Sequence, residues 1–171
     1  MELILSEVSM RAITIIAAGF ALATCATPRS GSSSARDGEL PPCPTSPNCV
    51  SSQARDREHQ VEPIPYRVSQ AEALVVLVDT IQSQPRTHIV TKTQDYLHAE
   101  FTSLVFRFVD DVECVIDENT KTIQIRSASR VGYWDFGVNR RRVENLRQEL
   151  APRLHASPAR EHGDGGAATP R

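Results

Sequence analysis

The sequence lacks a membrane-spanning run, a strong net charge and the signature motifs of several enzyme classes. Its 171 residues carry a net charge of −2, too small to mark the whole molecule as a binder of polyanions. No G-x-S-x-G, H-E-x-x-H or Walker A run is present, so no motif predicts the reactions that these runs support. The apolar run at 12–23 (AITIIAAGFALA) has 12 residues, whereas a spanning helix needs about 20.

That short run has the length of a signal-peptide core, and Arg11 supplies a positive charge before it. The LATC run ending at Cys25 resembles a bacterial lipobox, in which the chain is cut before the cysteine and the sulfur receives a diacylglyceryl group. Because Glu2 and Glu7 are acidic where a signal is basic, we predict Met10 as the true start. We expect a lipid-anchored protein on the periplasmic side of a bacterial cell envelope. The alternative is an ordinary secretory signal that leaves a soluble product.

Two segments flank the part of the chain that can fold. Residues 26–42 and 156–171 are rich in Ser, Gly, Pro and Ala and have almost no apolar periodicity. Such segments cannot bury enough surface to offset their ordering entropy, so we predict a flexible linker and a disordered tail. The remaining organisation is a signal segment at 1–25 and one domain at 43–155, large enough for one hydrophobic core.

Export allows the other cysteines to be interpreted. Cys43 and Cys49 flank two prolines in CPTSPNC, a spacing that suits a local disulfide in an oxidising compartment. A zinc site is the alternative, but two thiolates are half of a structural set and no His lies within finger spacing. Cys114 lies in an apolar strand pattern and is predicted to be a small buried hydrophobe. We predict neither a metal nor a cofactor.

Hydrophobic periodicity predicts two helices and five strands. The first helix follows a capping box at 69–72, and Asn139 is predicted to cap the second, which Pro152 could end early. The apolar stripes at helical spacing are Leu74, Leu77, Val78 and Ile81, then Val143, Leu146, Leu150 and Leu154. Alternation predicts strands at 61–66, 87–92, 96–103, 104–117 and 121–129. The order β-α-β-β-β-β-α predicts an α+β domain, a mostly antiparallel sheet covered on one face by two amphipathic helices.

The segment 126–142 (RSASRVGYWDFGVNRRR) has a local charge of +4, and three of its arginines fall in the first turn of the last helix. The helix dipole disfavours cations there by about 0.3–1 kcal/mol each, so negative groups should compensate. In one interpretation Asp110, Asp111 and Asp135 hold the arginines internally. In the other, the Gly-containing turn and the helix N-terminus bind an external phosphate or carboxylate, with Tyr133 and Trp134 as a stacking wall. The ligand-binding candidates are Arg126, Arg130, Tyr133, Asp135, Asn139, Arg140, Asp110 and Asp111.

A cell-envelope enzyme is the alternative function. His98 lies on the strand before Asp110 and Asp111, so a carboxylate and histidine site could be drawn from these three residues. Nucleic-acid binding is disfavoured by export and by the lack of an aromatic-plus-basic strand motif. The sequence favours a binding or scaffolding module with an anion-preferring, Arg-rich loop. Its expected partners are a membrane, through the lipid anchor, and a small anionic ligand or an envelope protein.

Several blocks in the same order resemble the domain of unknown function family DUF1499. They lie at 43–52, 85–87, 96–101, 108–113, 126–132 and 135–140, so the resemblance covers about residues 43–150. Two positions depart from the family's pattern: Trp134, where a small polar residue is usual, and Cys114, where a larger hydrophobe is usual. The resemblance implies an exported or membrane-associated protein of bacteria, with relatives in plastids and no established activity. It supports the domain limits and supplies no mechanism.

Overall fold

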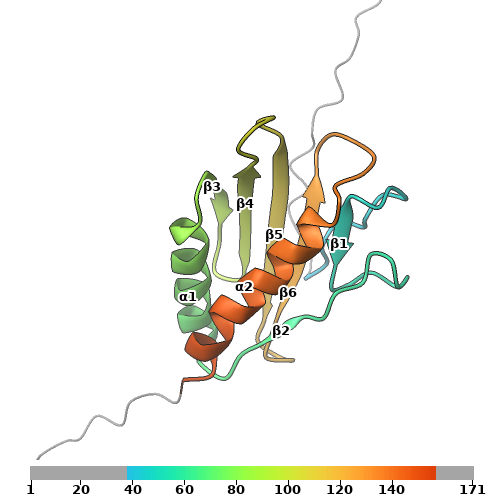
Figure 1. Ribbon diagram of the computed structural model, residues 1–171. Helices are drawn as coiled ribbons and strands as arrows, with labels where there is room; N and C mark the ends of the chain where they lie inside the picture. Colours follow the sequence, from blue (N-terminus) through green and yellow to red (C-terminus); the bar gives the residue numbers. More distant parts are fainter. Residues whose placement is uncertain (1–37, 157–171) are drawn as a thin grey trace, which may run out of the picture. The chain divides into compact units, whose positions relative to one another are not determined.

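Short alternating segments build the sheet of the computed structural model, which describes residues 38–156. In that part of the chain the predicted order of helices and strands is confirmed, and one further strand of three residues precedes it (Figure 1). The elements are β1 (Cys49–Ser51), β2 (Ile64–Pro65), α1 (Gln70–Ser83), β3 (Thr87–Lys92), β4 (Tyr96–Thr102), β5 (Val109–Asp117), β6 (Thr122–Ser129) and α2 (Val138–Leu154).

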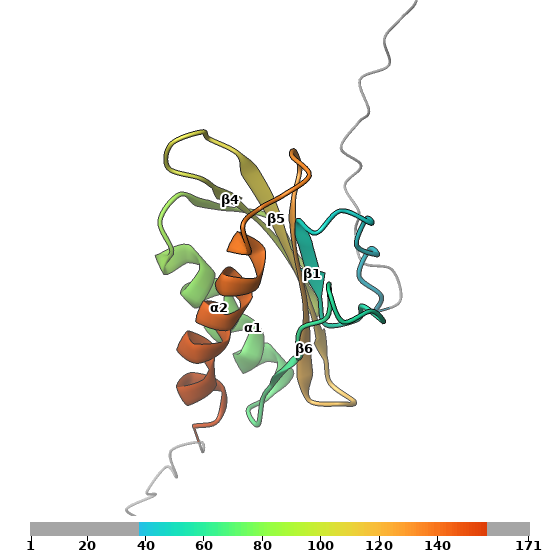
Figure 2. The same ribbon diagram turned by 45° about the vertical axis from the view of Figure 1, so that its right-hand side comes forward.

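All of these strands pair antiparallel, in the order β1-β6-β5-β4-β3, and β2 pairs beside β1 on the same edge of β6. Successive residues of a strand point to opposite faces, and both helices lie on one face of the sheet (Figure 2). Strand β5 therefore directs Val112, Cys114 and Ile116 into the core under the helices, where all three are buried. The predicted α+β class, with a mostly antiparallel sheet, is confirmed.

Helix α1 begins as its sequence predicts, because the Ser69 hydroxyl accepts a hydrogen bond from the Glu72 N–H at 3.2 Å. It then buries Leu77 and Ile81 fully, while Leu74 and Val78 pack at the margin of the core. The stripe predicted for α2 is entirely buried: Val143, Leu146, Leu150 and Leu154. Apolar spacing thus identified the buried face of α2, whereas the buried face of α1 is shifted from its predicted stripe and includes Ala73, Val76 and Thr80.

The start of α2 differs from the prediction. Asn139 is not the cap: Gly137 holds that position with a φ of 74°, a left-handed conformation that glycine adopts without strain. The Asp135 carboxylate accepts hydrogen bonds from the N–H groups of Gly137 at 2.8 Å and Asn139 at 2.9 Å. Pro152 does not end the helix early, since α2 continues to Leu154. The first turn of α2 therefore already has a negative group of its own.

The strand predicted at 104–117 begins only at Val109. Residues 103–108 form a loop between β4 and β5, which the Ser103 N–H closes by bonding the Phe108 carbonyl at 2.8 Å. Arg107 turns the chain with a φ of 57°. The alternation of Leu104, Phe106 and Phe108 is typical of a strand, yet all three side chains are exposed. They are exposed because the loop extends past the end of the face that the helices cover.

Several predictions concern residues outside the described range. The signal segment 1–25, the lipidation site Cys25, the start at Met10, residues 26–37 of the linker and residues 157–171 of the tail lie there. Between residues 38 and 156, neither helix combines the length and the apolar composition that crossing a membrane requires.

Candidate functional site

Asp110 and Asp111 are neighbours in sequence but lie on opposite faces of β5. Asp110 faces the helices, is 6% exposed, and its Oδ2 lies 2.6 Å from Nη2 of Arg142. The Arg142 guanidinium also lies over the Phe101 ring, 4.9 Å from its centroid. This carboxylate, which interrupts an otherwise apolar face, therefore has the cationic partner that burial demands.

Asp111 lies on the face that the helices leave uncovered. Its carboxylate bonds His98 at 2.7 Å and accepts two hydrogen bonds from Arg130, at 2.9 and 2.7 Å. Arg130 also binds Glu100 from β4. Partial burial of Asp111 would raise its pKa, but the hydrogen bonds from His98 and Arg130 outweigh burial and hold the pKa at about 2. The sheet separates this pair from Asp110, so the three residues proposed for an enzyme do not form one site.

A second ion pair lies deeper on the same face. Nη1 of Arg126 donates to Glu113 at 2.8 Å, and the Tyr96 hydroxyl donates to the other oxygen of Glu113 at 2.9 Å. Glu113 is only 1% exposed. Among the described residues, the buried Nε of Arg126 makes no hydrogen bond. Glu113, which the sequence analysis did not single out, neutralises Arg126.

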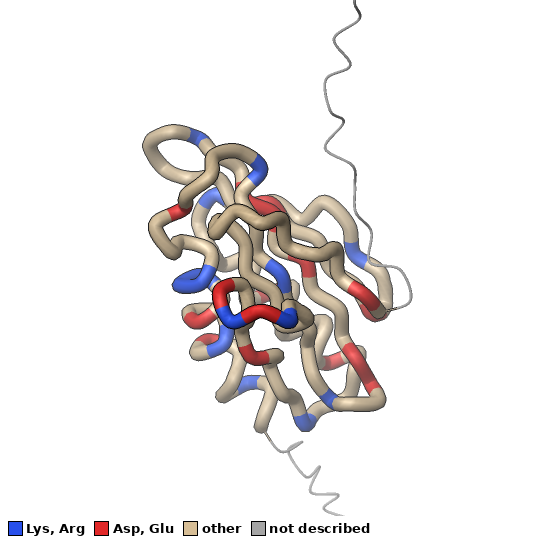
Figure 3. The backbone as a smooth tube through the Cα atoms, turned by 90° about the vertical axis from the view of Figure 1, so that its right-hand side faces the viewer, with Lys and Arg blue, Asp and Glu red and all other residues tan. Residues whose placement is uncertain are grey.

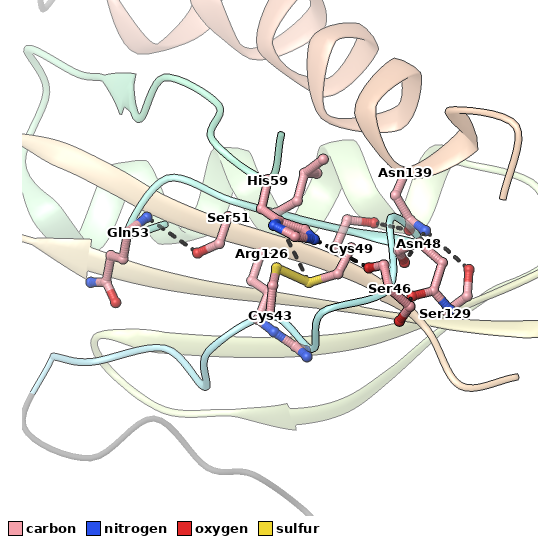
Figure 4. The surroundings of a disulfide bond; sticks show 12 residues. Cys43, Ser46, Asn48, Cys49, Ser51, Gln53, His59, Arg126, Ser129 and Asn139 are labelled. Atoms are coloured by element: carbon pink, nitrogen blue, oxygen red, sulfur yellow. Dashed lines mark hydrogen bonds between the residues drawn. A yellow bond between two sulfur atoms is a disulfide. The ribbon is translucent and has the colours of Figure 1, made fainter. Parts of the chain in front are cut away.

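Asn139 lies at the centre of a buried polar network that holds the loop between β6 and α2. Its amide nitrogen donates to the Asn48 carbonyl at 2.9 Å, to Ser129 at 3.0 Å and to Asp135 at 2.9 Å. Asn48 in turn donates from its side chain to the carbonyl of Gly132. Figure 4 shows Asn48 and Asn139 facing each other close to the disulfide. The network ties the disulfide loop to the base of the loop at 130–137.

The predicted disulfide is present and positions Asn48. Cys43 and Cys49 are joined with a Cα–Cα separation of 5.7 Å, and Asn48 precedes the second cysteine. Cys114 is free and fully buried in the core, as predicted. Burial and the nearby Glu113 carboxylate raise the pKa of its thiol far above the ordinary value.

The remaining arginines of the 126–142 segment bind carbonyl oxygens. Arg140 donates to the carbonyls of Gln60 at 2.8 Å and Glu58 at 2.7 Å, and Arg141 donates to that of Phe136 at 2.8 Å. Within residues 38–156, Asp135 pairs with none of the arginines, because it is used at the start of α2. Most arginines of this segment are thus held by groups within the domain, as in the first interpretation. Glu113 and backbone carbonyls supply the contacts that were expected from Asp135.

Exposed apolar side chains gather at one end of the domain. Nine of the eleven exposed large hydrophobic residues in the described range belong to the loop at 103–108 or to 131–138. We call this set the apolar tip: Leu104, Val105, Phe106, Phe108, Val131, Tyr133, Trp134, Phe136 and Val138. Figures 1 and 2 show both loops at the same end of the sheet, and Figure 3 shows them mostly in tan with few charged positions.

A cleft of about 340 Å³ lies at the base of the apolar tip. Ser103 and Val138, at the margins of the two loops, line it together with Arg86, Arg141 and Arg142. Arg142 is neutralised by Asp110, whereas Arg86 and Arg141 have no carboxylate partner among residues 38–156. The cleft is therefore basic. It shares Asp110 with the predicted ligand-binding set but otherwise differs from it.

Sequence reasoning singled out Tyr133 and Trp134 but missed the first loop of the tip for an identifiable reason. Leu104, Phe106 and Phe108 fit the period of a strand, and only the intervening Val105 argued against alternation. Arg86 carried no signal, because nothing in the sequence places it beside Arg141. No three His, Cys, Asp or Glu side chains of the described chain come together in a way that could hold a metal ion.

These observations define a small α+β domain with an internally satisfied arginine segment and an exposed apolar end. Residues 39–150 match the family described as Protein of unknown function (DUF1499), and the chain belongs to that family. The resemblance drawn from the sequence blocks is thereby confirmed. No curated protein matches the chain.

Proposed function

We propose that this chain is an exported, lipid-anchored binding module of a bacterial cell envelope, and that it binds through the apolar tip and the basic cleft beneath it. One observation carries the proposal: nine of the eleven exposed large hydrophobic side chains of the described range lie in the two loops at one end. Soluble monomers rarely expose apolar side chains in such a concentration unless the patch meets a partner.

The way the tip is held also supports binding. Asn48 bonds the Gly132 carbonyl and Asp135 bonds the first N–H groups of α2, so both ends of the second loop are fixed. The first loop is closed by two hydrogen bonds between Ser103 and Phe108. A rigid scaffold that presents exposed side chains on short loops is a common arrangement for recognition. The tip is thus preorganised for a partner.

An anion preference fits the cleft better than it fits the start of α2. Arg86 and Arg141 line the cleft without a carboxylate partner in the described range, while Asp135 occupies the helix N-terminus. Guanidinium groups bind phosphate or carboxylate oxygens through paired hydrogen bonds. The anion-preferring site is accordingly proposed at Arg86 and Arg141.

Export and anchoring are supported by the disulfide and by the sequence before it. Disulfides persist in oxidising compartments, and Cys43–Cys49 follows the predicted lipobox at Cys25 by fewer than 25 residues. Metabolic labelling with a radioactive fatty acid tests this part. The full chain should be labelled, and Cys25→Ser should abolish the label; a labelled Cys25→Ser chain would contradict the anchor.

The binding surface is tested by photo-crosslinking in intact cells. A photoreactive amino acid in place of Phe106 should form adducts, because that side chain is 73% exposed at the tip. The same amino acid in place of Val75, which is 65% exposed on α1, is the matched control. Equal adduct formation at the two positions, or none at Phe106, would count against the tip as the interaction surface.

An envelope enzyme is the weaker proposal. It would need His98 and Asp111 to act without Asp110, from which the sheet separates them. Asp111 is moreover saturated by His98 and Arg130.

A further inference from the structure

We infer that the partner of the apolar tip is the surface of a lipid bilayer that carries anionic headgroups. The tip side chains enter the interfacial layer, and arginines beside them bind lipid phosphates. This inference rests on the proposed function and names the partner of that same surface. It adds a second membrane contact to the predicted anchor, and one that orients the domain.

The composition of the tip is that of an interfacial anchor. Five of its nine side chains are aromatic, and each of the five is more than half exposed. Phe106 and Phe108 stack on each other with ring centroids 5.5 Å apart instead of packing on the core. Tyr133 and Trp134 combine an apolar ring with a polar atom, a combination enriched where hydrocarbon meets headgroups. The tip therefore suits a boundary between apolar and polar surroundings.

The charges around the tip have the sign that anionic lipids require. Arg107 lies between Phe106 and Phe108, and Arg86 and Arg141 line the cleft below. None of the three arginines pairs with a carboxylate within the described part of the chain. Arginine can bury its methylene groups among acyl chains while its guanidinium reaches a phosphate. The acidic residue of these loops, Asp135, is used at the start of α2.

The form of the tip also favours a bilayer over a protein. The two loops project past the ends of β4 and β6 (Figures 1 and 2). A rigid partner would need a matching hollow, whereas a bilayer yields to a convex surface. Phe136 has a φ of 54°, unusual for a bulky residue, and its side chain is 79% exposed. Packing of the ring against a described residue therefore does not account for this backbone conformation. Such a conformation is expected where the ring contacts something outside the chain.

The predicted anchor would keep the tip within reach of the membrane. Twelve residues, 26–37, separate Cys25 from the first described residue, and that number of residues spans at most about 40 Å. A lipidated chain would hold the domain at a high effective concentration over the bilayer, so even a weak contact of the tip would be populated.

Trp134 is the sole tryptophan and belongs to the tip, so its fluorescence reports insertion directly. The full chain is reconstituted into vesicles of phosphatidylglycerol and phosphatidylcholine, and into phosphatidylcholine alone, with brominated acyl chains as quenchers. We expect a blue-shifted emission that the bromine atoms quench, more strongly in the anionic vesicles. The readout is local, so attachment through the anchor cannot imitate it.

The variants separate apolar from electrostatic contributions. Phe106→Ser combined with Phe136→Ser should lower the insertion equilibrium by at least about tenfold, whereas Val75→Ser should leave it unchanged. Arg107→Gln with Arg141→Gln should remove the preference for anionic vesicles. Arg67→Gln, near the opposite end of α2, is the charge control. Inorganic phosphate tests the other source of the anion: protection of the fold by phosphate without any lipid-dependent quenching would overturn the inference.

Failure of the inference can be told from failure of the proposed function. If Trp134 stays accessible to acrylamide, and brominated lipid does not quench it in any vesicle, the inference that the bilayer is the partner is overturned. If the tip position 106 still forms protein adducts in cells, the binding function stands with an envelope protein as partner. If that crosslink is also absent, both proposals fall.

Discussion

At the scale of single residues, charge and burial decide what each polar side chain does. Asp110 and Arg142 form a pair in which each side chain is less than 15% exposed. Removing one charge leaves the other buried without compensation, a loss that typically costs about 3–5 kcal/mol. We therefore expect Asp110→Asn to lower the free energy of unfolding by about 3 kcal/mol in urea titrations.

The matched control for this substitution is Asp79→Asn. Asp79 pairs with Arg153, but both side chains are largely exposed, at 67% and 43%. Exposed pairs contribute about 0–1 kcal/mol. Similar losses in the two variants would show that the Asp110–Arg142 pair is not a buried internal contact.

His59 makes the stability of the domain depend on pH. Burial alone would lower its pKa, but hydrogen bonds to Asp56 at 2.7 Å and to the Ser46 carbonyl at 3.2 Å raise it above 6.5. A raised pKa in the folded state stabilises the protein fully below pH 6.5, and this contribution is lost as the pH rises through the folded value. Urea titrations from about pH 5 to pH 9 should show this loss.

Substitutions isolate the contribution of this histidine. Asp56→Asn should flatten the pH dependence, because it removes the charge partner. His88→Gln, at an exposed position of β3, should leave it intact. An unchanged slope in Asp56→Asn would contradict the assignment.

At the scale of elements, Asn139 decides where the loop before α2 lies. It is fully buried, and it binds three oxygen atoms from separate segments. We expect Asn139→Ala to destabilise the fold by about 2 kcal/mol or more, since buried partners lose their hydrogen bonds. Hydrogen exchange should also rise at residues 130–137. Asn145→Ala, on the exposed side of the same helix, should change neither quantity.

The disulfide loop acts on the same element from the other side. Closing the short loop between Cys43 and Cys49 should contribute about 2 kcal/mol through the entropy of the unfolded chain. Replacing both cysteines by alanine should remove this stabilisation, measured as a lower urea midpoint. It should also loosen residues 130–137 in hydrogen exchange, because Asn48 holds Gly132. If the urea midpoint falls but hydrogen exchange at residues 130–137 does not change, the disulfide stabilises the fold without holding that loop.

At the scale of the whole molecule, the described residues hold two clusters of buried apolar side chains, a large one that includes residues of both helices and a small one of Leu40, Tyr96 and Val115. Every buried apolar residue of the described range lies between Leu40 and Leu154. We therefore expect the fragment 38–156 to unfold cooperatively with the same midpoint as the full chain, measured by circular dichroism. A midpoint lower by several degrees would show that residues outside this range contribute to the core.

Much of the fold was predictable because its signals are local. The stripe from Val143 to Leu154 repeats at the spacing of one helix face, and the spacing of Cys43 and Cys49 suits a local disulfide. The site was less predictable. Asp110 and Arg142 are 32 residues apart, and only the register of the sheet and the placement of α2 bring them together.

The sequence by itself determined the α+β class, the buried face of α2, the disulfide and the buried Cys114, because periodicity and spacing are properties of neighbouring residues. Tertiary structure alone decided that Asp110 pairs with Arg142, that Asp135 serves the helix start, and that Phe106 is exposed. The physical reason is coverage: an apolar residue in a strand-like pattern becomes core only where another element lies over it. None of the described elements lies over the tip, so the same strand-like pattern of apolar residues forms an exposed surface there.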